Sequence, residues 1–197
     1  FQTKQNSQSQ FLSATINQKT EENTENTKTD QYTSVKLRIY PNKKQRKLLN
    51  HWFGASRFIY NNCLDHIKKH YKTTGSLKNV LKVKYLRNRF IKNDNYNTNN
   101  TWMLNIPFDV RDEAMRDLIK NYSSNIAKNL IKSYKFDLKF KSKKNQTESI
   151  NVLSKHWGKR TGMFSGIFNS NKLKCERKLP IELDHTCRLI KTRLKKY

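Results

Sequence analysis

The chain has 197 residues, with 41 Lys and Arg against 15 Asp and Glu, so its formal net charge at pH 7 is +26. A charge of this size favours a polyanion as the partner. Hydrophobic residues make up 35% of the chain, so any core must be compact, and the aromatic fraction of 11% argues against a disordered basic tail.

Several classes of protein are excluded. The three cysteines, Cys63, Cys175 and Cys187, are scattered and form no Cys-x-x-Cys pair, which argues against a disulfide framework or a zinc knuckle. No apolar run approaches the roughly 18 residues that a membrane span needs, and no signal peptide is visible. Because the first residue is Phe1 rather than Met, we expect a fragment of a longer protein.

The first elements follow a polar segment. Residues 1–32 are rich in Gln, Asn, Thr and Ser, and we predict a disordered tail there. Residues 34–40 alternate apolar and polar side chains, which predicts a half-buried strand with Lys36 and Arg38 on its outer face. Pro41 ends this strand.

Two helices are predicted next. Asn42 with Gln45 three residues later is typical of a helix cap, and a long helical pattern follows it. Gly54 interrupts this pattern, either as a kink or as a site of close packing. Residues 77–91 predict a second, weaker helix, and residues 93–101 a polar loop.

A third helix is the strongest element of the pattern. Apolar residues recur at helical spacing from Val110 to about Tyr134, which predicts one buried face. Asp109 is placed to cap this helix, and Asp112 and Glu113 fall in its first turn, where negative charge suits the helix dipole. We therefore expect a rigid helix against which the earlier helices pack.

After this helix the period changes to two. Residues 136–140 alternate and predict a strand, and a basic turn follows at residues 141–144. Further strands are predicted at 149–153, 163–168, 173–175 and 188–193, with a hairpin loop at 158–162. The predicted fold class is α+β: a small antiparallel barrel, similar to an oligonucleotide-binding fold, which a helical lobe interrupts. Such barrels are common nucleic-acid platforms.

Each candidate site has a plain structural alternative. The turn with Lys141, Lys143 and Lys144 either grips phosphates or is a solvated loop. The helix start at residues 108–112 either approaches a groove of a nucleic acid or only packs and caps. His66 and His70 are spaced i, i+4, but no third metal ligand lies near them in the sequence, so we assign no metal site.

A resemblance to a known family is carried by segments that keep the family's order: Val35–Asn42, Trp52–Asn61, Ile106–Ala114, Phe136–Lys144 and Leu189–Arg193. In these segments the chain resembles the OrfB/TnpB transposon proteins and their eukaryotic and giant-virus relatives, the Fanzor proteins. The resemblance covers residues 33–197. The spelling Phe-Asp-Leu-Lys-Phe at 136–140 and the segment His156–Arg160 are closer to the Fanzor group.

The resemblance implies an RNA-guided DNA endonuclease in which a wedge barrel and a recognition lobe bind a structured guide RNA and the target DNA. It also implies a division of the chain. The polar tail would be 1–32, the first wedge strand 33–40, the helical recognition lobe 41–134 and the remaining wedge strands 135–197.

Site residues follow from the same resemblance. Those expected to read the target-adjacent DNA are Phe108, Asp109, Arg111, Asp112, Arg57, Tyr60 and Asn61. Those expected to hold RNA or phosphate are Lys36, Arg38, Lys139, Lys141, Lys143, Lys144, Lys159 and Arg160.

The family cleaves DNA with a RuvC-like domain that binds Mg²⁺, followed by a Zn²⁺ ribbon, and both lie downstream of the segment seen here. With no RuvC-like catalytic residues and no cofactor of its own, this chain is expected to bind and not to cut, as a nuclease fragment or a truncated derivative. The alternative is a stand-alone nucleic-acid-binding protein, repressor-like or a general RNA binder. A Fanzor-type protein would act in the nucleus of its host, and a bacterial one in the cytoplasm.

Overall fold

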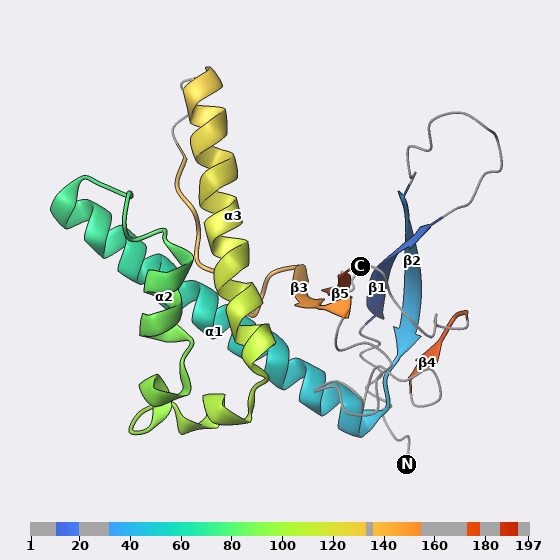
Figure 1. The fold of residues 1–197 in the computed structure, drawn as a ribbon. Coiled ribbons are helices and arrows are strands. Elements are labelled where there is room, and N and C mark those ends of the chain that lie inside the picture. The colour runs from blue at the N-terminus through green and yellow to red at the C-terminus, as the bar shows by residue number, and fades with distance from the viewer. Residues whose placement is uncertain (1–10, 20–31, 133–135, 155–172, 178–185, 193–197) are drawn as a thin grey trace, which may run out of the picture. The chain divides into compact units, whose positions relative to one another are not determined.

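The computed structural model describes most of the chain, namely residues 11–19, 32–132, 136–154, 173–177 and 186–192 (Figure 1). The chain forms two compact units. Residues 1–46 and 146–197 make up a sheet unit, and residues 47–145 make up a helical unit that is inserted into it.

The sheet unit contains one five-stranded antiparallel sheet with the strand order β3-β5-β1-β2-β4. Its strands are β1 (Phe11–Lys19), β2 (Tyr32–Tyr40), β3 (Thr147–Val152), β4 (Lys174–Cys175) and β5 (Cys187–Thr192). The central strand β1 pairs with β2 on one side and with β5 on the other.

The two faces of this sheet differ because successive side chains of a strand point to opposite faces. Leu37, Ile39, Ile150 and Leu189 are at most 4% exposed and define the buried face. The register agrees with this arrangement, since Ala14 lies opposite both Leu37 and Leu189. Hydrophobic burial on one face thus fixes the register.

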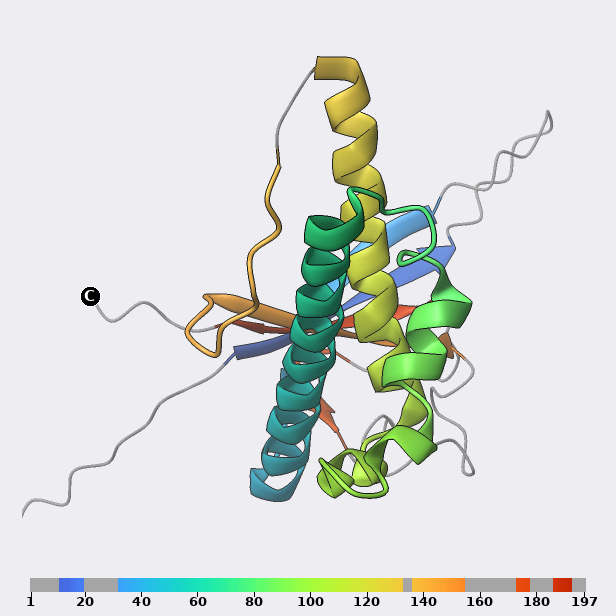
Figure 2. The ribbon, with the colours of Figure 1, turned by 90° about the vertical axis from the view of Figure 1, so that its left-hand side faces the viewer.

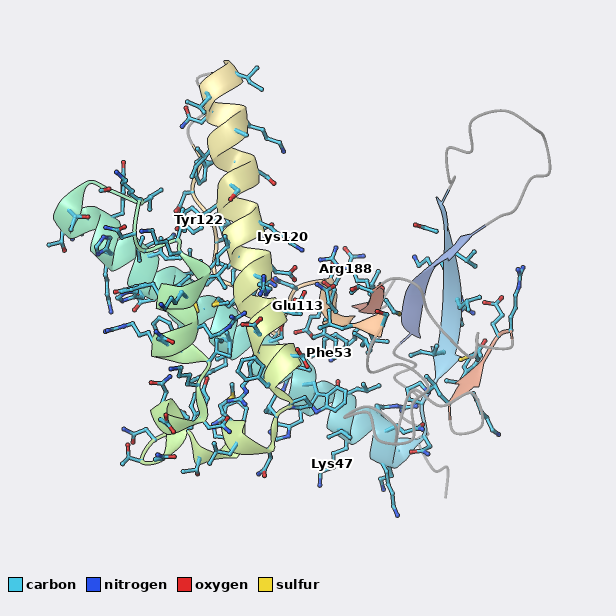
Figure 3. The ribbon with its side chains drawn as sticks, in the orientation of Figure 1. Lys47, Phe53, Glu113, Lys120, Tyr122 and Arg188 are labelled. Atoms are coloured by element: carbon cyan, nitrogen blue, oxygen red, sulfur yellow. The ribbon has the colours of Figure 1, made fainter. Side chains whose placement is uncertain are left out.

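The helical unit is built from helices of very different length. They are α1 (Lys43–Thr74), α2 (Val83–Phe90) and α3 (Phe108–Lys132), with short 3-10 helices η1 (Asn93–Tyr96) and η2 (Thr101–Asn105). α3 crosses α1 (Figure 1), and α2 packs beside α3 (Figure 2). Fully buried side chains line these contacts, among them Phe53 on α1 (Figure 3), Ile59, Leu64, Leu86, Met115 and Leu118.

Both ends of α1 are fixed by local chemistry. The Asn42 amide N–H donates to Gln45 Oε1 at 2.9 Å, and the Gln45 N–H donates to Asn42 Oδ1 at 2.9 Å, which is a reciprocal capping box. At the other end Gly75 has φ +67°, and its N–H donates to the Tyr71 carbonyl at 2.8 Å. A residue without a Cβ enters this left-handed conformation at little cost.

The strand at 34–40, the helix cap at Asn42 and the long third helix are confirmed as β2, the capping box and α3. The second helix is shorter than predicted, since turns occupy 78–81 and α2 begins at Val83. The predicted loop at 93–101 contains η1.

Several expectations are corrected. No pairing joins the edge strands β3 and β4 among the described residues, so the closed barrel is not supported and the sheet is open. The first 32 residues are not wholly disordered, because Phe11–Lys19 forms β1 with ladder partners on both sides. Gly54 neither kinks α1 nor marks close packing. A Cβ built there would lie 3.7 Å from Arg57 Nη2, an ordinary contact.

A further correction concerns α3, which starts two residues earlier than expected. Asp109 therefore lies inside the first turn and is not the capping residue. The N–H groups of Val110 and Arg111 bond to the Pro107 carbonyl instead. The predicted strand at 163–168 and the hairpin at 158–162 fall outside the described residues.

Residues 136–140 are extended but belong to no strand. Their alternation serves contacts with helices. Phe136 packs edge-on against Tyr122 of α3, with ring centroids 6.0 Å apart, and Asp137 pairs with Lys68 of α1 at 2.7 Å. A period of two therefore arises here without a sheet: Phe136 and Leu138 are half-buried, whereas Asp137, Lys139 and Phe140 are exposed.

Candidate nucleic-acid interface

The exposed face of the sheet is basic. Lys36 and Arg38 on β2 and Arg188 on β5 (Figure 3) are exposed, and the register places Lys36 and Arg188 on either side of β1, both opposite Thr15. At the edge, Lys174 of β4 is exposed opposite Tyr40 of β2, which is 49% exposed.

No acidic residue falls on this face in the described strands. The one acidic strand residue, Glu148 of β3, lies on the buried face and pairs with Lys191 of β5 at 3.3 Å. The strands thus carry a buried ion pair on one face and exposed cations on the other. Directly after β4, Glu176 is exposed beside Arg38, and its N–H donates to the Arg38 carbonyl at 2.9 Å.

A second basic element belongs to the helical unit. Residues 136–145, here named the basic strip, run antiparallel to α1 and are fixed to it at two places. Lys68 pairs with Asp137 at 2.7 Å, and its Nζ lies 5.3 Å from the Phe140 ring centroid. About two turns earlier on α1, the side chain of Asn61 bonds to the backbone of Lys141.

The basic strip ends in a turn with a defined hydrogen-bond pattern. The Lys144 N–H donates to Ser142 Oγ and the Asn145 N–H donates to the Ser142 carbonyl, both at 3.1 Å. Lys139, Lys143 and Lys144 are exposed, and Lys141 is half-buried. This turn, here named the basic turn, therefore presents several ammonium groups on a constrained backbone.

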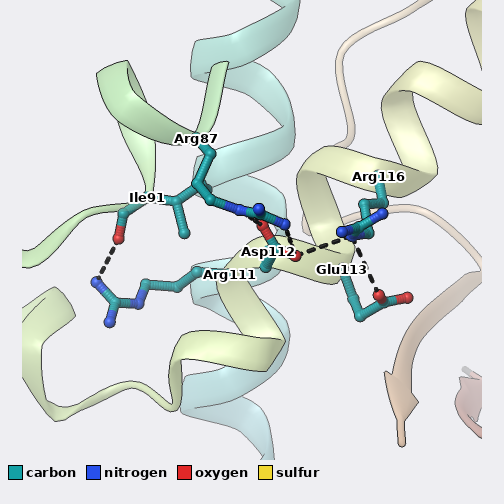
Figure 4. Close-up of polar contacts among 6 residues, drawn as sticks. All are labelled: Arg87, Ile91, Arg111, Asp112, Glu113 and Arg116. Carbon is teal, nitrogen blue, oxygen red and sulfur yellow. Dashed lines mark hydrogen bonds and ion pairs between the residues drawn. The ribbon is translucent and has the colours of Figure 1, made fainter. Parts of the chain in front are cut away.

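The start of α3 carries an internal ion network (Figure 4). Asp112 is only 6% exposed. Arg87 of α2 donates one hydrogen bond to each carboxylate oxygen of Asp112, both at 2.8 Å. Arg116 Nε donates a further hydrogen bond to Asp112 Oδ2 at 2.8 Å. Burial alone raises the pKa of Asp112, but the hydrogen bonds from the two arginines outweigh it, so the pKa is lowered below its usual value.

Arg111 is buried beside this network, with 2% of its surface exposed. Its Nη1 donates to the Ile91 carbonyl at 3.1 Å, and its Nη2 donates to Asn93 Oδ1 at 2.8 Å. Its guanidinium also lies over the rings of Tyr96 and Phe108, 5.2 and 5.7 Å from their centroids. Arg111 and Asp112 therefore fasten α2 and η1 to α3.

The residues expected to read DNA fall into two groups. Phe108, Asp109, Arg111 and Asp112 come together at the start of α3, where Phe108 is 37% exposed and Asp109 is half-buried. Arg57, Tyr60 and Asn61 lie on α1. Arg57 is half-buried, and Tyr60 is 3% exposed. A direct DNA contact for any of them stays a prediction.

The residues expected to bind phosphate divide between the units, with Lys36 and Arg38 on the sheet and Lys139, Lys141, Lys143 and Lys144 on the basic strip. Lys159 and Arg160 lie outside the described residues. Sequence reasoning missed Arg188 and Lys174. The alternation of buried Cys187 and Leu189 around Arg188 is the signal that could have found the first of these.

Of the histidines of α1, His66 packs against α2. His66 Nε2 lies 3.0 Å from the Tyr85 hydroxyl, and its ring stacks on Tyr85 with centroids 5.7 Å apart. Burial, Arg89 and His70 lower the pKa of His66. Within the described part of the chain, no group of three or more His, Cys, Asp or Glu side chains is placed to hold a metal ion.

A search over the described helices found none that is long and apolar enough to cross a membrane.

In a comparison with protein families, residues 31–76 match the OrfB/IS605 helix-turn-helix domain. The match supports a relation to OrfB/IS605 transposase-associated proteins. A comparison with curated proteins found no match.

The OrfB/IS605 match has a clear structural extent. It covers β2, the capping box and all of α1, and it ends just after the Gly75 turn. The next helix, α2, begins at Val83. The matched region thus supplies both the strand that carries Lys36 and Arg38 and the helix to which the basic strip is fixed.

Proposed function

We propose that this chain is the guide-RNA- and target-DNA-binding part of an RNA-guided DNA endonuclease of the OrfB/TnpB kind. The observation that carries the proposal is the position of the OrfB/IS605 match. It falls on the one strand and the one helix that organise the two basic surfaces, the exposed face of β2 and the basic strip on α1.

The electrostatics support a nucleic acid as the ligand. A net charge of +26 attracts a polyanion from a distance, and each phosphate that a Lys or Arg neutralises releases counterions from the nucleic acid. Exposed lysines and arginines on a sheet and on a fixed turn suit phosphate contacts, which position a nucleic acid without reading its sequence. Base pairing by the guide RNA supplies the sequence specificity in this proposal.

The target-adjacent DNA motif is proposed to be read at the start of α3. Phe108 is partly exposed there, and its ring is backed by the guanidinium of Arg111. In this arrangement the buried residues Arg111 and Asp112 do not contact DNA but hold the start of α3, with Phe108, in position. The sheet unit would act as the wedge, and membership of the Fanzor group is part of the same proposal.

Co-purification of RNA tests the proposal. The chain is expressed together with the transcribed DNA that follows its gene, washed at high salt, and the retained RNA is sequenced. We expect one discrete structured RNA that ends near the boundary of the element. A smear of cellular RNA would instead identify a general RNA binder, and the absence of retained RNA would reject a guide-binding role.

A further inference from the structure

One side chain of α1 forms a bridge to the basic strip that resembles a pairing between two strands. Asn61 Nδ2 donates to the Lys141 carbonyl at 2.9 Å, and the Lys141 N–H donates to Asn61 Oδ1 at 2.8 Å. The two residues are 80 positions apart in the chain. The carboxamide therefore satisfies both backbone polar groups of Lys141 at once.

The neighbouring residue holds the side chain of the same lysine. Lys141 Nζ lies 4.0 Å from the centroid of the Tyr60 ring, a cation–π contact. Tyr60 is itself fixed, because it is buried and its hydroxyl accepts a hydrogen bond from Asn121 Nδ2 of α3 at 3.2 Å. Burial raises the pKa of the Tyr60 phenol, so the ring remains neutral beneath the ammonium group.

We propose that Asn61 is a positioning residue for phosphate binding, which acts through the basic turn and does not itself touch the nucleic acid. This inference rests on the proposed function. Lys143 and Lys144 lie two and three residues after Lys141. The bridge therefore fixes the position of the backbone that leads into the basic turn. A turn that is ordered before binding loses less conformational freedom when phosphates bind to it.

The inference also assigns a different role to a residue that the sequence suggests as a DNA reader. Asn61 is half-buried, and both ends of its carboxamide are engaged with the Lys141 backbone. A direct reading of bases requires those same polar atoms to face a groove. Here they face the strip, which favours an indirect role.

The chain offers a matched control in the next residue. Asn62 is also a half-buried asparagine of α1, but its Nδ2 donates to the Phe58 carbonyl at 2.9 Å, within its own helix. Asn62→Ala thus removes the same chemical group from the same helix and leaves the basic turn untouched.

A double-mutant cycle tests the inference. Binding of the full chain to a fluorescent structured RNA is measured for Asn61→Ala, for the Ala replacement of Lys141, Lys143 and Lys144, and for both changes together. We expect Asn61→Ala to weaken binding about three- to tenfold, as the removal of two hydrogen bonds implies. In the background without the three lysines its effect should fall below about twofold, and Asn62→Ala should also stay below about twofold.

Other results would overturn the inference. If Asn61→Ala causes the same loss with and without the three lysines, Asn61 contacts the nucleic acid directly. If Asn62→Ala is equally damaging, the effect belongs to the helix as a whole. Asn61→Leu keeps a similar shape and lacks both hydrogen bonds, so it replaces Asn61→Ala if circular dichroism shows that the alanine variant does not fold.

Amide hydrogen exchange separates this inference from the proposed function. The Lys141 N–H should exchange slowly in the wild-type chain and in Asn62→Ala, and much faster in Asn61→Ala, whether or not nucleic acid is present. A protected amide in a chain that binds no RNA would reject the proposed function and leave the bridge intact. An unprotected wild-type amide would reject the positioning role itself.

Discussion

Replacing Asp112 with Asn should strongly destabilise the helical unit. The carboxylate is 6% exposed and accepts three charge-assisted hydrogen bonds at 2.8 Å, two from Arg87 and one from Arg116. Removing one member of a fully buried ion pair costs about 3–5 kcal/mol, because the partner charge is left without compensation. Exposed pairs are worth only about 0.2–1 kcal/mol.

The cost of Asp112→Asn should lie between the values for buried and exposed pairs, because the two arginines are partly exposed. Their side chains are 33% and 39% exposed, so water partly solvates both guanidinium groups after the carboxylate is removed. We therefore expect a loss of about 2–3 kcal/mol in the free energy of unfolding, measured by urea titration with circular dichroism at pH 7.

Asp65→Asn is the matched control for this prediction. Asp65 pairs with Lys69 four residues later on α1, and both side chains are well exposed, at 48% and 76%. Such a pair contributes about 0.3–0.5 kcal/mol. If the two substitutions lower the stability equally, the reasoning from burial is wrong.

The same carboxylate predicts a pH dependence. Because the folded-state pKa of Asp112 is lowered, its contribution is fully present above the unfolded value of about 3.9 and is lost as the pH falls through the folded pKa. Wild-type stability should therefore drop more steeply than that of Asp112→Asn on acidification below about pH 4. Parallel curves would show that Asp112 titrates alike in both states.

Four further substitutions test separate parts of the molecule. Alanine at the three lysines of the basic turn should weaken binding to all duplex sequences alike and reduce the salt slope by about 0.9 for each phosphate that is no longer neutralised; an affinity independent of salt would contradict this. Lys36→Ala with Arg38→Ala should lower RNA affinity at unchanged thermal stability, since both side chains are exposed, and a fall in the melting temperature would point to a structural role. Asn42→Ala should cost about 0.5–2 kcal/mol in urea unfolding through loss of the capping box, and no change would show that the cap is replaceable. Gly75→Ala should cost about 1–2 kcal/mol because of the positive φ, and unchanged stability would show that the turn relaxes.

The sequence predicts the elements whose determinants are local. β2 follows from strict alternation, and the start of α1 follows from Asn42 and Gln45, whose two hydrogen bonds span three residues. α3 follows from a helical period sustained over 25 residues. In each case the pattern that predicts the element lies within a short stretch of the chain, although β2 and α3 also pack against other elements.

The elements that the sequence misses depend on distant partners. β1 alternates Leu12, Ala14 and Ile16 with polar residues, but it lies in a segment rich in Gln, Asn, Thr and Ser. Its ladder partners are β2 and β5, and β5 lies at the opposite end of the described chain. Residues 136–140 alternate like a strand, yet the groups that satisfy them belong to α1 and α3.

The burial of Arg111 and Asp112 is not predicted from the sequence for the same reason. Arg111 and Asp112 have the composition of a polar surface, whereas Arg87, which neutralises Asp112, lies 25 residues earlier on another helix. Burial of an ion pair depends on packing between helices, which no local pattern reports. Exposed cations such as Lys36 are easier to assign, because the alternation of their own strand places them outside.

The strand order has a consequence for folding. β5, which pairs with both β1 and β3, is the last strand in the described chain, and its residue Leu189 pairs with Ala14 across the whole helical insertion. Contacts of such long sequence separation form slowly. The helical unit is continuous in sequence, so it can fold on the ribosome before the sheet is complete. β1 and β2 can pair with each other early, but the sheet is completed only after β5 has been synthesised.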